Sequence, residues 1–132
     1  MHDFEEIEHT ADWSFRVRGK TFGQLLENAA RAMHSFGRIE AEGKSSTREI
    51  EVQGVDRETL LVNWLNEILY LEQRHDEIYD RFEIFEVSDT HLRATVYGRS
   101  APAGSHIKAV TFHNLAVKQT SEGFEATVVL DV

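Results

Sequence analysis

Two acidic side chains stand near the two ends of this sequence, and both are placed where carboxylates could bind a cation. Asp12 lies close to the start, and Asp131 ends a strand-like apolar run just before Val132. The Asp131 side chain and the α-carboxylate of Val132 would be two anions one residue apart, which is costly unless a cation or a group of donors lies between them. If the fold brings Asp12 to the same place, the three groups form an all-oxygen ligand set that suits a hard divalent metal ion.

The histidines offer weaker chemistry than these carboxylates. The sequence has 7 of them, spread without the spacing of a metal site. His9 precedes Asp12 by three residues, and on an extended strand this odd separation places the two side chains on opposite faces unless the chain turns between them. We therefore interpret His9 as a structural hydrogen-bonding residue and His113 as a core or hairpin residue. Phosphate-binding glycine loops, nucleophile elbows and zinc helices are absent from the sequence.

Lys108 is a further residue that could act near Asp131. If Gln119 pairs with Phe124 in a hairpin, Asp131 lies opposite residue 112 and Lys108 lies four residues further along. At about 3.3 Å per residue this distance is too long for a direct ion pair, unless a bulge shortens the strand. Lys108 is then expected to reach a ligand or a partner rather than the metal.

Composition limits the kind of protein that these residues belong to. The chain has 132 residues, 41% hydrophobic and 28% charged, which is typical of one soluble globular domain spanning residues 1–132. It contains no cysteine, which excludes disulfides, thiolate metal sites and thiol catalysis. No apolar run approaches the roughly 20 residues that cross a bilayer, and the acidic start is unlike a signal peptide. We expect a cytoplasmic protein that does not enter membranes.

Charge argues against direct nucleic-acid binding. The formal net charge is −9, and the basic residues are scattered among a majority of acids. A protein that grips a phosphodiester backbone needs a basic surface, because neutralising phosphates supplies most of its affinity. An acidic protein is better suited to a metal ion or to a basic protein partner.

Hydrophobic periodicity predicts the elements that must position these side chains. Two short strands are expected within residues 5–18, followed by a helix with Thr21 as its N-cap and Gly37 as its C-terminal stop. Residues 47–53 alternate like a third strand. Asp56 can cap a second helix that runs to about Arg74 and is apolar around most of its circumference. Its polar stripe (Asn63, Asn66, Glu67, Tyr70, Arg74) is interpreted as a solvated or capped face.

Residues after 80 alternate with the period of strands. Residues 82–87 and 92–97 flank one turn, and residues 107–119 and 124–130 flank another. Two early helices and late hairpins predict an α+β fold, a two-layer sandwich in which two helices pack on a mostly antiparallel β-sheet.

Five sequence blocks, in order along the chain, resemble the archease family. They are His9-Thr10-Ala11-Asp12, Glu27-Asn28-Ala29-Ala30, Leu60-Leu61-Val62-Asn63-Trp64-Leu65-Asn66-Glu67, Lys108-Ala109-Val110-Thr111-Phe112-His113 and Leu130-Asp131-Val132. No single block is decisive, but their order and spacing together form a specific signal. Two departures are Asn63, where the family commonly has an acid, and Phe112 in place of the usual tyrosine.

The resemblance implies a function that composition could not supply. Archeases are accessory proteins of the RNA-splicing ligase, which joins 2′,3′-cyclic or 3′-phosphate ends to 5′-hydroxyl ends in tRNA splicing and RNA repair. They are not enzymes but promote the attachment of GMP to a ligase histidine, and so support multiple turnover. Some members are also described as chaperones of a tRNA methyltransferase.

The family's functional residues match positions already noted in this chain. Its metal ligands correspond to Asp12, Asp131 and Val132, and its functional lysine corresponds to Lys108. The expected ion is calcium, with manganese or magnesium as alternatives. The rival interpretations are a binding module or chaperone whose acidic surface docks a basic partner, and a metal-dependent hydrolase with Glu67 or His113 as its general base.

Overall fold

The computed structural model describes residues 4–7, 13–37, 43–101, 107–112 and 115–132, and nothing outside these ranges is described. Within them the chain forms strands and helices in a mixed order. The elements are β1 (Phe4–Ile7), β2 (Trp13–Gly19), α1 (Phe22–Gly37), β3 (Ser45–Gln53), α2 (Arg57–His75), β4 (Glu77–Val87), β5 (His91–Ser100), β6 (Ala109–Thr111), β7 (Val117–Thr120) and β8 (Gly123–Asp131).

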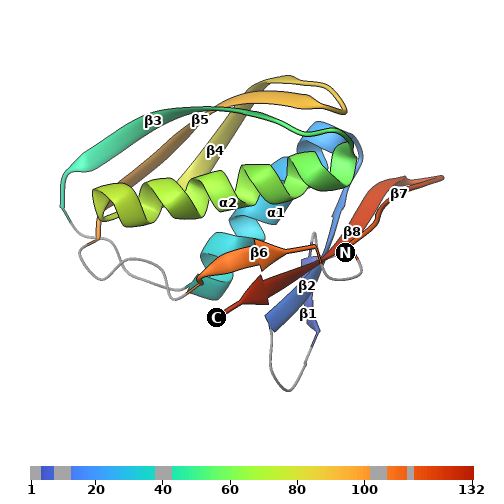
Figure 1. Ribbon diagram of the computed structural model, residues 1–132, viewed down its shortest axis with the longest axis horizontal. Helices are drawn as coiled ribbons and strands as arrows, with labels where there is room; N and C mark the ends of the chain where they lie inside the picture. The colour runs from blue at the N-terminus through green and yellow to red at the C-terminus, as the bar shows by residue number, and fades with distance from the viewer. Residues whose placement is uncertain (1–3, 8–12, 38–42, 102–106, 113–114) are drawn as a thin grey trace.

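The strands form two antiparallel sheets with the helices between them (Figure 1). One sheet has the order β1-β2-β8-β6, with β7 also paired to β8, and the other has the order β3-β5-β4. Helix α1 packs on β2 and β4, while α2 packs on β3, β4 and β6. The predicted α+β class, with two helices on antiparallel strands, is confirmed, and the strands are divided between two sheets.

Both helices begin as the sequence predicts. The Thr21 hydroxyl accepts a hydrogen bond from the Gln24 amide at 3.1 Å, and the Asp56 carboxylate accepts one from the Thr59 amide at 2.8 Å. These bonds satisfy backbone donors that the first turn of a helix leaves without partners. Helix α2 ends at His75, after which Asp76 takes a left-handed conformation with φ 52°. None of the helices in the described ranges has the length and apolar character that crossing a membrane requires.

The apolar sides of the helices and sheets meet in one core. Phe15 and Val17 of β2 face the same core as Leu25 of α1 and Leu65 of α2. Trp64 is fully buried, and its indole N–H donates to the Leu26 carbonyl at 2.9 Å, which ties α2 to α1. The apolar circumference predicted for α2 is explained by its position between the two sheets.

Two stretches differ from the sequence-based prediction. β4 begins at Glu77 rather than at residue 82. The sequence pattern missed its first residues because Glu77, Ile78 and Tyr79 are all buried and show no alternation. The predicted strand over residues 107–119 is wrong as one element, because β6 and β7 are separate strands. They pair with β8 in registers three residues apart, since Gln119 faces Phe124 whereas Ala109 faces Asp131.

Candidate functional site

Asp131 lies at the end of β8, the central strand of the larger sheet. The preceding residue, Leu130, is fully buried, and the strand alternation turns the Asp131 side chain the other way, into solvent. Trp13, the first residue of β2, is the cross-strand partner of Leu130. The start of β2 and the end of β8 therefore lie side by side.

Asp12, His9 and His113 fall outside the described residues. The proximity of Asp12 to Asp131 stays a prediction, and so do the structural roles of the two histidines. Trp13 is the described residue that follows Asp12 in the chain, and it is 39% exposed. Its ring lies 6.3 Å from that of Phe36, at the far end of α1.

Lys108 lies next to Asp131, contrary to the register expected from the sequence. Its backbone N–H donates to the Asp131 carbonyl at 2.7 Å, and the following residue, Ala109, is the cross-strand partner of Asp131. The three-residue difference between the registers of β6 and β7 produces this placement. The sequence allowed Lys108 to approach Asp131 only if a bulge shortened the strand between Lys108 and Gln119. The change of register between β6 and β7 has this effect. Both side chains are exposed.

Asn66 of α2 holds the other edge of β6. Its side-chain oxygen accepts from the Val110 N–H at 2.8 Å, and its side-chain nitrogen donates to the Val110 carbonyl at 3.2 Å. Asn63, one turn earlier, donates to the Gln53 carbonyl at 2.7 Å. The sequence interpretation of this stripe as a solvated or capped face missed both roles. The signal was two carboxamides three residues apart on a helix otherwise rich in buried apolar residues.

The donor chemistry at the end of β8 fits a hard cation. Asp131 offers an exposed carboxylate, and Val132, which is 38% exposed, adds main-chain oxygen. Oxygen ligands of this kind are preferred by calcium, magnesium and manganese. Across the described ranges no three His, Cys, Asp or Glu residues are grouped closely enough to hold a metal ion.

Two exposed apolar residues, Trp13 and Val132, lie at this end of the sheet. Phe112, at the other end of β6, is 55% exposed. Exposed aromatic side chains are common where proteins meet partners. The candidate site thus combines an anion, a cation and apolar surface, a combination suited to a protein partner.

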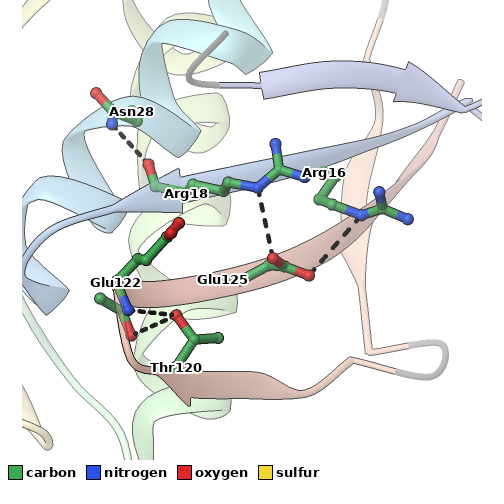
Figure 2. Close-up of polar contacts among 7 residues, drawn as sticks. Arg16, Arg18, Asn28, Thr120, Glu122 and Glu125 are labelled. Atoms are coloured by element: carbon green, nitrogen blue, oxygen red, sulfur yellow. Dashed lines mark hydrogen bonds and ion pairs between the residues drawn. The ribbon is translucent and has the colours of Figure 1, made fainter. Parts of the chain in front are cut away.

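A recess of about 600 Å³ lies where the β7–β8 turn meets the start of α1, and Figure 2 shows several of the residues that line it. Arg18 and Lys20 line it together with Glu122 and Glu125, so the two charge signs are balanced. Arg18 is held by Glu125 at 3.4 Å, and its carbonyl accepts from the Asn28 side chain at 2.7 Å. These contacts join β8 to β2 and α1, and we assign the recess a structural role.

A partly buried polar network lies near the C-terminal end of α2, where β4 begins. Arg48 forms two hydrogen bonds with Glu77, at 3.0 and 2.9 Å, and the Tyr79 hydroxyl donates to the same carboxylate at 2.6 Å. The bonds from Arg48 lower the pKa of Glu77 below its ordinary value. Burial, together with the bond to Glu77, raises the pKa of Tyr79. The network joins β3 to β4 and lies on different elements from Asp131 and Lys108.

Comparison with known proteins gives a consistent result. The sequence matches the Archease protein family over residues 4–132. A protein archease from Methanosarcina acetivorans is 36% identical over an alignment covering 98% of this chain and 95% of the relative. The protein archease of Methanothermobacter thermautotrophicus is 32% identical, and both chains are covered completely.

Two solved structures have similar folds. The solution structure of protein 1598 from Methanobacterium thermoautotrophicum superposes with a TM-score of 0.72, is 30% identical, and is covered completely, as is this chain. The crystal structure of an archease and possible chaperone from Thermotoga maritima gives a TM-score of 0.69 at 23% identity, covering 97% of this chain and 96% of that one. The second likeness concerns the fold alone.

Proposed function

The chain belongs to the archease family, and we propose that it is a metal-binding accessory protein that activates an RNA-splicing ligase. The activated step is the attachment of GMP to the ligase's own histidine, which precedes the joining of 3′-phosphate or 2′,3′-cyclic phosphate ends to 5′-hydroxyl ends. The protein itself performs no chemical step on RNA. Its partner is the ligase protein, and its place of action is the cytoplasm.

One observation supports the proposal: the start of β2 and the residue before β6 both lie beside the end of β8. Trp13, which follows Asp12 in the chain, pairs with Leu130, which precedes Asp131. On the other side of β8, the Lys108 amide donates to the Asp131 carbonyl. Residues far apart in the sequence are thus drawn together where an accessory protein could present them to a partner.

We assign the metal site to Asp12, Asp131 and Val132. Calcium is the expected ion, with manganese or magnesium as alternatives, because all the ligands are oxygens. A bound divalent ion would supply positive charge near the ligase's nucleotide site. The carboxylates would hold that charge at the sheet end, where the Lys108 backbone bonds to that of Asp131 and the Lys108 side chain is exposed. An anionic phosphate of the nucleotide or of the ligase–GMP adduct is the complementary chemistry.

The decisive test compares two charge-removing variants in a GMP-labelling assay of the cognate ligase. Asp131→Asn should abolish stimulation of labelling while changing the free energy of unfolding by less than about 0.5 kcal/mol, because the side chain is exposed. Glu122→Gln removes the same charge from the exposed β7–β8 turn and should stimulate like the wild type. These variants test the site more specifically than a chelator does, because a chelator also removes cations from the ligase and the nucleotide.

Cation binding can be measured separately with terbium(III), a luminescent substitute for calcium. Trp13 is partly exposed beside the proposed ligands, whereas Trp64 is fully buried. Excitation of Trp13 should sensitise terbium emission in the wild type and in Glu122→Gln. Asp131→Asn should weaken terbium binding at least about tenfold.

Equal stimulation by Asp131→Asn and the wild type would overturn the metal-dependent proposal. It would favour the alternative in which this archease is a binding module or chaperone, for example of a tRNA methyltransferase, and acts through its exposed apolar residues. The Thermotoga maritima relative is named a possible chaperone, and Trp13 and Phe112 offer apolar surface for such a role.

A further inference from the structure

Strand β6 is short and lies at the edge of its sheet. It contains three residues, Ala109–Thr111, and pairs with β8 on one side only. The outward backbone groups of an edge strand lack ladder partners, and a buried backbone group without a partner is costly. The side chain of Val110, at the middle of β6, is 4% exposed. The edge at this position therefore needs a hydrogen-bonding partner.

Asn66 is this partner, and its side chain offers the same donor and acceptor groups as the backbone of a neighbouring strand. A carboxamide carries one acceptor oxygen and one donor nitrogen, as a peptide group does. Here the oxygen faces the Val110 N–H at 2.8 Å and the nitrogen faces the Val110 carbonyl at 3.2 Å. Only one of the two orientations of the amide satisfies both groups, so the pair is specific for asparagine chemistry.

The base of this contact is rigid. Asn66 lies on α2 next to Leu65 and close to Trp64, both of which are fully buried between the two sheets. β6 is consequently fixed on one side by the ladder to β8 and on the other by a helix that cannot shift without disturbing the core. Two residues before Val110, the Lys108 amide bonds to the Asp131 carbonyl, so the position of β6 sets where Lys108 and Asp131 stand relative to each other.

We propose that Asn66 is a positioning residue for ligase activation, which holds β6 so that Lys108 and Asp131 keep the geometry that the metal site and the ligase require. This inference rests on the proposed function, because it names the residue that orders the same site. Asn66 itself touches neither the metal nor the ligase.

The test uses the full chain with two substitutions at position 66 and one matched control. Asn66→Ala removes both bonds to Val110. Asn66→Asp keeps the volume and the acceptor but removes the donor, and it places a carboxylate against the Val110 carbonyl. Asn63→Ala is the control, because it removes a helix-to-strand side-chain bond from the same helix, directed to Gln53 rather than to β6.

Three quantities separate a positioning role from a merely structural one. They are the hydrogen-exchange protection of the Lys108 amide, the affinity for terbium(III), and the stimulation of GMP labelling. In both position-66 variants we expect Lys108 protection to fall about tenfold and terbium binding to weaken about tenfold. Stimulation should fall in parallel. The Asn63→Ala variant loses one exposed bond rather than two part-buried ones, and it should leave all three quantities at the wild-type level.

The possible failures are distinguishable. If the wild type binds terbium but both position-66 variants bind and stimulate equally well, the positioning role is overturned and the proposed function stands. If Asn63→Ala weakens terbium binding as much as Asn66→Ala, the effect is general loosening and the positioning role is also overturned. If the wild type binds no cation, the metal site fails and the inference fails with it. Asn66→Asp keeps the test valid if Asn66→Ala folds poorly.

Discussion

Glu72 is an acidic residue on a helix face that otherwise packs into the core. It is 4% exposed, and its carboxylate accepts a hydrogen bond from the Tyr79 amide at 3.1 Å. Burial raises the pKa of Glu72 to about 7, and the bond from Tyr79 offsets only part of this shift. The residue therefore changes charge near neutral pH, unlike an ordinary glutamate.

Glu72 should make this protein less stable as the pH rises from about 4.5 to about 7. Below this window the carboxyl is protonated in both the folded and the unfolded chain, so burial carries no charge penalty. Within it the folded chain keeps a proton that the unfolded chain releases, so the free energy of unfolding falls with pH. Above pH 7 the penalty is on the order of 3 kcal/mol. Urea unfolding of Glu72→Gln and the wild type at pH 4.5 and pH 8 measures it.

The difference between variant and wild type isolates Glu72 from other titrating groups. Burial lowers the pKa of His34, against the opposing influence of Asp80, so His34 makes stability rise with pH below about 6.5. That contribution is common to both proteins and cancels. Glu72→Gln should be more stable than the wild type at pH 8 and nearly equal to it at pH 4.5. A difference that does not change with pH would contradict the assignment.

Residue types point to candidate chemistry more readily than to the residues that would support it. Asp131 and Lys108 stand out in the sequence because nothing in a strand pattern requires charges there. Asn66 and Glu72 do not stand out, because an amide or an acid on a helix is usually solvated. Asn66 bonds to a strand edge because β6 lies against α2, and Glu72 is buried because β4 lies against α2. Neither placement can be predicted from the local sequence.

At the level of elements, β4 and β5 approach each other very closely at Gly98. A Cβ added there would lie 1.9 Å from the Ile78 carbonyl oxygen and 2.8 Å from the Tyr79 Cα. These neighbours are backbone atoms that cannot rotate away. The register between the strands shifts just beyond this point, between Tyr79 and Arg81.

Gly98→Ala should therefore lower the free energy of unfolding by about 3 kcal/mol or more, since the added methyl group must push two strands apart. Gly23→Ala is the matched control, because its Cβ would meet only side-chain atoms, those of Val87 at 3.2 Å and Thr21 at 3.9 Å, which can move. That variant should stay within about 1 kcal/mol of the wild type. Denaturant midpoints measure both, and equal values for the two variants would contradict the close approach.

The break between β6 and β7 shows a limit of periodicity. Residues 107–119 alternate well enough to suggest one strand, and the Gln119–Phe124 pairing of the hairpin was predicted correctly. The alternation of apolar residues does not reveal that β6 and β7 pair with β8 in registers three residues apart, because both strands present apolar side chains to the same core. The helix starts were predictable for the opposite reason, because Thr21 and Asp56 act through bonds to their own helices.

For the whole molecule, Trp64 joins parts that otherwise belong to different layers. Its indole bonds to Leu26 of α1, and its ring lies edge-on to Phe82 of β4, with 6.2 Å between ring centroids. We expect the two sheets and the helices to unfold together because they share this core.

Trp64→Phe should lower the free energy of unfolding by about 2–3 kcal/mol, through a lost hydrogen bond and an unfilled volume. The transition should remain single, with an unchanged dependence on denaturant. Far-ultraviolet circular dichroism and near-ultraviolet signals measured in parallel would test this, and separate transitions would contradict it. Trp13→Phe, at the partly exposed tryptophan, should change stability by less than about 1 kcal/mol.

The α+β class, both helices and the hairpins could be predicted from the sequence. The division of the strands between two sheets could not, because strand patterns say which face is apolar but not which strand lies alongside. Likewise the closeness of Lys108 to Asp131 depends on pairing between strands that local patterns do not specify.

The central position of β8 has a consequence for how this protein is made. β8 follows every other described strand in the chain, yet it separates β2 from β6 and β7 in the larger sheet. During synthesis β2 therefore leaves the ribosome long before β8, its central partner in the sheet. The apolar side of β2 stays exposed until β8 has been made. Chains that stop earlier lack both the sheet's centre and Asp131. The same strand thus makes closure of the larger sheet a late event in synthesis.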